Sequence, residues 1–147
     1  MATPLYTIGF TKSSAEHFFG RLERAGVRRL VDIRLNNTST LAGFTKRDDL
    51  AYFLRAILDA EYQHEPLLAP TPEMLKAYQG KQLTWAEYET AYIALMQARD
   101  LANTLDRAAF YRPTALLCSE ATPEHCHRRL VAEHLRTAWR DLEIIHL

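Results

Sequence analysis

The stretch LYTIGFTKSSAEHFFGRLERAGVRRLVDI, residues 5–33, decides the fold class because it holds two apolar strands separated by one helix. Residues 5–8 are a short apolar, β-favouring run that ends at a glycine, and residues 30–33 are a second such run. Between them, Ser13 begins a Ser-x-x-Glu box that predicts a helix start, and Gly26 predicts the end of that helix. The stretch therefore predicts a βαβ unit.

The rest of the chain continues this alternation of short apolar strands and longer helices. We find neither an internal repeat nor a linker. The further predicted elements are a helix from about Thr45, a short strand at 62–64, helices that begin at Thr71 and Thr84, a strand at 114–118, a helix that begins at Thr122 and a strand at 143–147. This order predicts an α/β fold: a single three-layer, Rossmann-like domain over residues 1–147, with a mainly parallel sheet and helices on both faces.

The composition is that of an ordinary folded protein. The 147 residues are 48% apolar and 24% charged, which is enough for one domain with its own core. Basic and acidic residues number 18 each, so the net charge gives no support for nonspecific nucleic-acid binding or for adhesion to an anionic membrane. The first residues do not resemble a signal peptide, and no stretch is apolar enough to span a membrane. With only two cysteines, we expect a cytoplasmic protein with reduced thiols and no membrane partner.

Arginines are distributed unevenly along the chain. Five lie within residues 21–34 and four within residues 128–140. This distribution is compatible with a local basic surface and also with solvated helix faces.

Polar residues follow three of the predicted strands at the point where each strand ends. Thr11 follows the first strand, Asp32 and Arg34 end the second, and Cys118 and Glu120 end the late strand. In open parallel sheets, ligands bind at the carboxyl ends of the strands. If the three strands are neighbours, we expect these residues to form one rim of a single cleft, with Thr11 and Arg34 binding an anion.

Cys126, His127 and Arg128 fall in the first two turns of the helix predicted to begin at Thr122. Unpaired amides and the helix dipole favour an anion at such a start, and the same field would stabilise a thiolate on Cys126. We therefore expect a phosphate to be held by this segment together with Arg34. The chain contains neither Gly-x-x-x-x-Gly-Lys-Ser/Thr nor Gly-x-Gly-x-x-Gly, so a P-loop and a dinucleotide fingerprint are excluded.

Several of these residues admit two interpretations. Asp32 and Glu120 fit a general acid and base pair, but Asp32 beside Arg34 equally fits a buried ion pair that holds a loop. Cys118 fits a nucleophile or a small core residue. Lys46 is a further candidate for binding the anion.

The two cysteines raise the question of zinc because His125 and His127 flank Cys126. These histidines are two positions apart on a helix and point in different directions, so we expect no metal site, and the sequence identifies no cofactor. A reducing compartment also disfavours a disulfide between Cys118 and Cys126.

The chain resembles the bacterial and archaeal family called domain of unknown function 488 along nearly its whole length. The matching segments are residues 8–11, 31–34, 44–46 and 62–64, Trp85 with Tyr88 and Tyr92, and above all residues 117–120 followed by residues 123–128. The resemblance implies an α/β fold and a site formed by Asp32, Arg34, Cys118, Glu120, Cys126, His127 and Arg128. Many members have a histidine where this chain has Phe10, which argues against a mechanism that needs an imidazole there.

Three functions are compatible with this pattern. The first is an enzyme that acts on a phosphate-bearing substrate such as a nucleotide or a nucleic-acid end. In that hypothesis Arg34 and Arg128 hold the anion, Asp32 or Glu120 moves a proton, and a cysteine is the nucleophile or part of the wall. The second is a noncatalytic nucleic-acid or nucleotide binding module with aromatic stacking platforms, and the third is a cysteine-based redox or metal-binding protein. The oligomeric state is left open.

Overall fold

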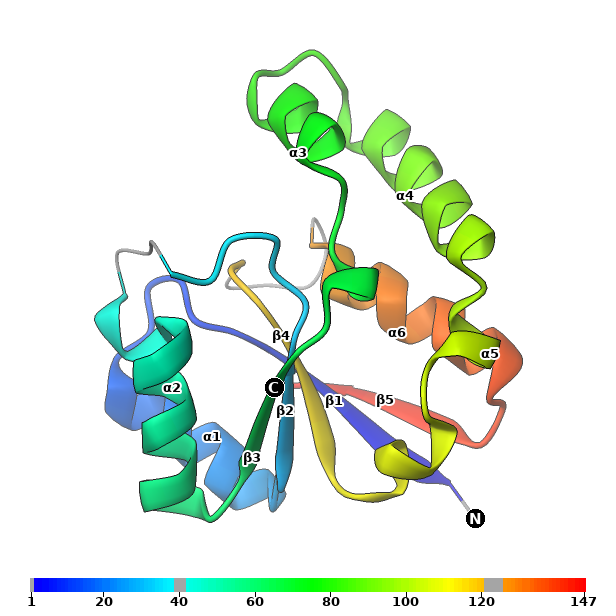
Figure 1. Ribbon diagram of the computed structural model, residues 1–147. Coiled ribbons are helices and arrows are strands. Elements are labelled where there is room, and N and C mark those ends of the chain that lie inside the picture. The colour runs from blue at the N-terminus through cyan, green and yellow to red at the C-terminus, as the bar shows by residue number, and fades with distance from the viewer. Residues whose placement is uncertain (1, 39–41, 121–125) are drawn as a thin grey trace.

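Five strands form one sheet in the order β3-β2-β4-β1-β5, and all neighbouring pairs are parallel (Figure 1). The computed structural model describes residues 2–38, 42–120 and 126–147. The strands are β1 Thr3–Gly9, β2 Arg29–Asp32, β3 Glu61–His64, β4 Thr114–Cys118 and β5 Leu142–His146. The predicted mainly parallel sheet is confirmed, and the bounds of β4 are those predicted from its apolar run.

Helices cover both faces of the sheet, as predicted (Figure 1). On one face lie α1 Ala15–Ala25, α2 Arg47–Phe53 and its continuation η2 Leu54–Leu58; on the other lie α4 Trp85–Arg99, α5 Leu101–Thr104 and α6 His127–Ala138. The remaining helical segments are α3 Pro72–Gln79 and the short turns η1 Gly43–Thr45, η3 Pro66–Leu68 and η4 Arg107–Tyr111. Within the described parts of the chain, no helix combines the length and the apolar character needed to cross a membrane.

The pleat of β4 assigns its side chains alternately to two separate cores. Ala115 and Leu117 pack with α1 and α2, whereas Leu116 and Cys118 pack with α4 and α6. Successive side chains of a strand point to opposite faces, so this alternation is the expected one. It places the thiol of Cys118 on the face that is covered by α4 and α6.

Helix starts follow the predicted capping signals at α3 and α4 and are shifted at α1 and α6. Thr71 and Thr84 cap α3 and α4 as predicted. For α1 the prediction of Ser13 as the capping residue is wrong. Ser14 has the extended backbone that an N-cap requires, and its hydroxyl accepts a hydrogen bond from the amide of His17.

The order of the strands brings the predicted rim together. β1 and β2 are not paired with each other, because β4 lies between them and pairs with both. The three strand ends that carry Phe10, Arg34 and Cys118 are therefore neighbours, as expected. The helices α3 and α4 extend beyond this edge of the sheet, and we call these two helices the arm (Figure 1).

Candidate functional site

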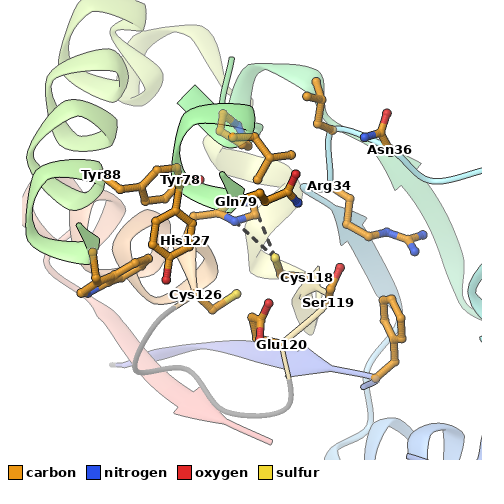
Figure 2. A pocket seen from close by; sticks show the side chains of 15 residues that line it. Arg34, Asn36, Tyr78, Gln79, Tyr88, Cys118, Ser119, Glu120, Cys126 and His127 are labelled. Carbon is orange, nitrogen blue, oxygen red and sulfur yellow. Dashed lines mark hydrogen bonds between the residues drawn. The ribbon is translucent and has the colours of Figure 1, made fainter. Parts of the chain in front are cut away.

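A cavity of about 270 Å³ opens where β4 ends, between the edge of the sheet and the arm formed by α3 and α4. We call it the strand-end cavity (Figure 2). Its polar lining comes from the loop after β2, the end of β4 and the start of α6, and its apolar lining comes mostly from the arm. The lining residues are Phe10, Arg34, Leu35, Asn36, Pro70, Leu75, Tyr78, Gln79, Trp85, Tyr88, Cys118, Ser119, Glu120, Cys126 and His127.

The floor of the cavity contains a hydrogen-bonded pair, Cys118 and His127. The sulfur of Cys118 lies 3.3 Å from Nδ1 of His127, and both side chains are buried (Figure 2). The second ring nitrogen, Nε2, lies 3.7 Å from the same sulfur and 2.9 Å from the carbonyl oxygen of Ile33. A carbonyl oxygen can only accept, so Nε2 carries the hydrogen and Nδ1 is the ring nitrogen without one. The backbone after β2 thus sets the tautomer of His127.

Cys126 occupies the N-cap position of α6, beside this pair, and is 2% exposed. Its hydrogen bond with Cys118 and its burial raise the pKa of the thiol well above the usual range. The raised pKa disfavours a thiolate on Cys126, contrary to the prediction that the start of the helix would stabilise one. Thr122 and His125 lie outside the described residues, but the prediction that Cys126 lies within the first turns of the helix is wrong, because α6 begins at His127 and Cys126 is extended.

One donor atom from each of Cys118, Cys126 and His127 lies within 4.8 Å of the other two. The sequence prediction of no metal site considered His125 and His127 as a pair. It did not foresee that the end of β4 and the start of α6 would bring three donors together. Both cysteines are free thiols in the structure.

Three aromatic side chains of the arm form one side of the cavity, and we call them the aromatic wall: Tyr78, Trp85 and Tyr88. The ring centroids are 4.8 Å apart for Tyr78 and Tyr88, 5.5 Å for Trp85 and Tyr88, and 5.7 Å for Tyr78 and Trp85. The sequence interpretation did not place a stacking surface here. The signal was present in the three-residue spacing of Trp85 and Tyr88, which puts both on one face of a helix.

The aromatic wall is joined to the floor through Tyr92. Its ring stacks on Tyr88 at 6.1 Å and meets the edge of the His127 ring at 5.4 Å. Its hydroxyl donates to the carbonyl of Leu68. Burial raises the pKa of both tyrosines, so their hydroxyls stay protonated at neutral pH. These contacts fix the position of the imidazole ring relative to the wall.

Asp32 is fully buried and does not line the cavity. Its carboxylate accepts hydrogen bonds from Arg34 Nε at 2.9 Å, Arg34 NH2 at 2.8 Å and the hydroxyl of Tyr62 at 2.6 Å. Burial and the bond to Asp32 raise the pKa of Tyr62. Of the two interpretations of Asp32, the structure has the buried ion pair that holds a loop.

Arg34 lines the cavity although it is only 4% exposed. Its guanidinium group also donates to the carbonyl of Thr45 and lies 5.2 Å from the centre of the Phe10 ring. Its NH1 atom is buried and has no hydrogen-bond partner among the described residues. In Figure 2 the guanidinium group points away from the two sulfur atoms. Arg34 is thus a buried cation at the border of the cavity, and Asp32 neutralises its charge.

Arg128 was expected to bind an anion, but it does not line the cavity. Adjacent helical positions point about 100° apart, so His127 faces the cavity and Arg128 faces the sheet. Arg128 is fully buried, and its NH1 atom donates to the carbonyl of Glu120 at 2.8 Å. A Cβ atom on Gly9 would lie 2.3 Å from this NH1 atom and 1.6 Å from the Glu120 oxygen. Glycine at position 9 and Arg128 together hold the Glu120 segment in place.

Two other candidates for anion binding also lie outside the lining. Thr11 is exposed, and its hydroxyl donates to the carbonyl of Ser119 at 2.6 Å. Lys46 is exposed at the N-cap position of α2. In contrast, Glu120 is exposed and lines the cavity, as the sequence predicted.

Arginines within residues 21–34 form hydrogen bonds between separate parts of the fold, and this use limits the basic surface that they could form. Arg21 donates to the carbonyls of Leu147 and Gly9, and Arg28 donates to the carbonyl of Leu58. This use leaves fewer cations for a nucleic-acid backbone than the composition of the segment indicated.

One family model matches most of the length of the chain. The model described as Domain of unknown function DUF488 matches residues 14–135. The chain belongs to this family. The DUF488 match includes every residue that lines the strand-end cavity except Phe10. No curated protein and no solved structure matches the chain. The DUF488 description states no activity, so only the site bears on the function of the chain.

Proposed function

We propose that this DUF488 protein is an enzyme that acts on a nucleotide, or on a nucleotide at the end of a nucleic acid, bound in the strand-end cavity. The proposal depends on one observation: the aromatic wall and the polar group of Cys118, His127 and Glu120 line the same cavity. The strand-end cavity thus offers a surface for a planar ring of the substrate together with polar groups that could react with it.

The aromatic wall supports a planar ligand. Stacking of a base on aromatic side chains contributes about 1–3 kcal/mol and tolerates every base. Tyr78 and Trp85 are only partly buried and line the cavity, so part of each side chain is accessible to a ligand. The volume of about 270 Å³ is close to the lower end of the range of small-molecule sites, which suits a single nucleotide.

Polar groups around the wall support the recognition of a base and a phosphate. The exposed amide side chains of Asn36 and Gln79 line the cavity and can pair with the edge of a base. Arg34 is the single arginine among the described lining residues, and its NH1 atom has no partner among them. In this proposal the side chain of Arg34 turns toward the cavity when a phosphate binds, and NH1 then donates to a phosphate oxygen.

Glu120 and the Cys118–His127 pair supply the chemistry. Glu120 has the one carboxylate in the described lining, and a carboxylate at the edge of a bound ring can move a proton. The imidazole of His127 is oriented by the Ile33 carbonyl, as the base of a catalytic pair must be. In this proposal Asp32 is a positioning residue, which holds Arg34 against the cavity.

Binding is tested by the fluorescence of Trp85 during titration with nucleoside monophosphates. The chain has two tryptophans, so the titration is done on a Trp139→Phe background. Saturable quenching is expected, and Tyr78→Ala should weaken binding by about 5- to 150-fold, since stacking is worth about 1–3 kcal/mol. The control is Tyr111→Ala, which removes a 63% exposed tyrosine of η4, before the opposite end of β4. Equal effects of the two substitutions would contradict the proposal.

Catalysis is tested by incubating the protein with the nucleotides that bind and separating the products by chromatography. We expect product from the unmodified protein and at least a tenfold to hundredfold loss with Glu120→Gln, with binding preserved. Ligand binding without conversion of any nucleotide would support the noncatalytic binding module in place of the enzyme.

A further inference from the structure

The buried group of Cys118, Cys126 and His127 has the donor set of a zinc site. Two sulfur atoms and one imidazole nitrogen lie within 4.8 Å of one another, and all three side chains are buried. Thiolate and imidazole ligands are those that zinc prefers in proteins. The two segments that supply them, the end of β4 and the start of α6, are held by the sheet and by helix packing.

The tautomer of His127 is that of a histidine able to bind a metal through Nδ1. A histidine that binds a metal usually donates its other ring N–H to a carboxylate or a backbone carbonyl, which fixes the tautomer. Here Nε2 is 2.9 Å from the Ile33 carbonyl oxygen, which leaves Nδ1 as the ring nitrogen without a hydrogen, 3.3 Å from the sulfur of Cys118. This partner is a backbone atom, independent of the two cysteines.

The spacing of the donors also fits. Tetrahedral zinc, with bonds of about 2.3 Å to sulfur and about 2.0–2.1 Å to nitrogen, places these two ligand atoms roughly 3.6 Å apart. The sulfur of Cys118 and Nδ1 of His127 are 3.3 Å apart. For this pair the separation differs from the tetrahedral value by a few tenths of an ångström, and binding would also turn the lone pair of Nδ1 toward the ion, since the same sulfur lies 3.7 Å from Nε2.

We propose that Cys118, Cys126 and His127 bind one zinc ion whose fourth coordination position opens into the strand-end cavity. Structural zinc sites have four protein ligands, whereas catalytic sites have three and leave one position for water or substrate. All three residues line the cavity, so the open position faces the place where a ligand would lie.

The catalytic use of this ion rests on the proposed function, with Cys118 and His127 as zinc ligands in place of a nucleophile and its base, and with Glu120 as the residue that moves the proton. Zinc lowers the pKa of a bound water, and that water supplies a nucleophile at neutral pH. The water transfers one proton to Glu120 while its oxygen bonds to an electrophilic carbon of the substrate. The bond from that carbon to the leaving group then breaks, and the leaving group takes the proton from Glu120. The net reaction is a hydrolysis, with water as the second reactant.

The test measures metal content without any substrate. The full-length chain is expressed with added zinc, purified without chelators and analysed for metals, and the metal-free protein is titrated with Co²⁺. We expect about one zinc per chain, together with charge-transfer and tetrahedral ligand-field bands of a Co²⁺–thiolate complex. Cys126→Ser and His127→Gln should each weaken zinc binding by at least about tenfold.

The control is His134→Gln, which changes another histidine of α6 outside the cavity lining and should keep the full zinc content. Circular dichroism of each variant shows whether it is folded, and the cobalt spectrum of the unmodified protein tests the site without any substitution. Absence of zinc and of cobalt bands from the folded, unmodified protein would overturn the proposal, as would formation of a Cys118–Cys126 disulfide in its place. Nucleotide quenching of Trp85 is measured separately, so the failure of the metal site and the failure of the nucleotide site give different results.

Discussion

Replacing Asp32 by asparagine removes one charge from a buried ion pair and keeps the size of the side chain. Asp32 is fully buried and accepts three hydrogen bonds from Arg34, from its Nε, NH2 and backbone N atoms, and one from the hydroxyl of Tyr62. The guanidinium group, which is 4% exposed, would lose its neutralising partner. Breaking a buried pair from one side costs about 3–5 kcal/mol, so we expect a loss of that size in the free energy of unfolding.

Urea denaturation followed by far-ultraviolet circular dichroism measures this loss. The matched control is Asp48→Asn, which breaks the pair of Arg47 and Asp48, whose side chains are 51% and 87% exposed. We expect this control to change stability by less than about 0.5 kcal/mol. A third variant, Asp32→Leu with Arg34→Met, removes both buried charges and should be more stable than Asp32→Asn. If Asp32→Asn costs under about 1 kcal/mol, the reasoning from burial is refuted.

Three further predictions concern the backbone, a helix cap and acid stability. Gly9→Ala should destabilise the protein by about 3 kcal/mol or more in thermal denaturation, because the new Cβ would lie 1.6 Å from the carbonyl oxygen of Glu120; an unchanged melting temperature would show that this segment moves freely. Thr84→Ala removes the capping box with Glu87 and should cost about 1 kcal/mol in urea denaturation, and a gain would contradict the assignment. Hydrogen bonds from its arginine and threonine partners lower the pKa of Asp141 below the unfolded value of about 3.9, so its contribution is present above that pH and is lost as the pH falls through the folded pKa. Asp141→Asn should therefore reduce the difference in unfolding midpoint between neutral and acidic pH; an unaltered difference would exclude this role.

The strands were predictable because their signals are local. Residues 114–118 are apolar throughout, and their strand is buried along its whole length, as expected for the centre of a parallel sheet. The position of that strand between β1 and β2 was not predictable in the same way, since no local pattern states which strands pair. The rim was expected only on the condition that three strands are neighbours, and the sheet order meets that condition.

The site was predictable in part, and the limit was the direction of the side chains. Arg34, Cys118, Glu120, Cys126 and His127 line the cavity as a group. Thr11, Asp32, Lys46 and Arg128 were expected from their places at strand and helix ends, but their side chains point elsewhere. The place of a residue at the end of a strand or helix determines where its backbone lies. It does not determine the direction of its side chain, because the side chains of adjacent residues can point to opposite faces of the sheet.

The aromatic wall could not be placed because it depends on how two helices sit relative to the sheet. Tyr88, Tyr92 and Met96 recur at helical spacing and are all buried, which is the usual pattern of core residues. Tyr88 also borders the cavity because α3 and α4 extend past the end of β4 (Figure 1). The spacing of apolar residues within one helix does not determine how that helix packs against another.

The insertion of β4 between β1 and β2 has a consequence for the order in which the molecule is made. During synthesis, residues 3–64, which hold β1, β2 and β3, are made before the residues of β4, the strand that lies between β1 and β2 in the sheet. β4 can join the sheet only after residue 118 has emerged, so the middle of the sheet forms late and across a long loop, which slows folding. Cys126 and His127, the partners of Cys118, are made later still, so a chain truncated at residue 118 has all the residues of the central strand but lacks the group of Cys118, Cys126 and His127.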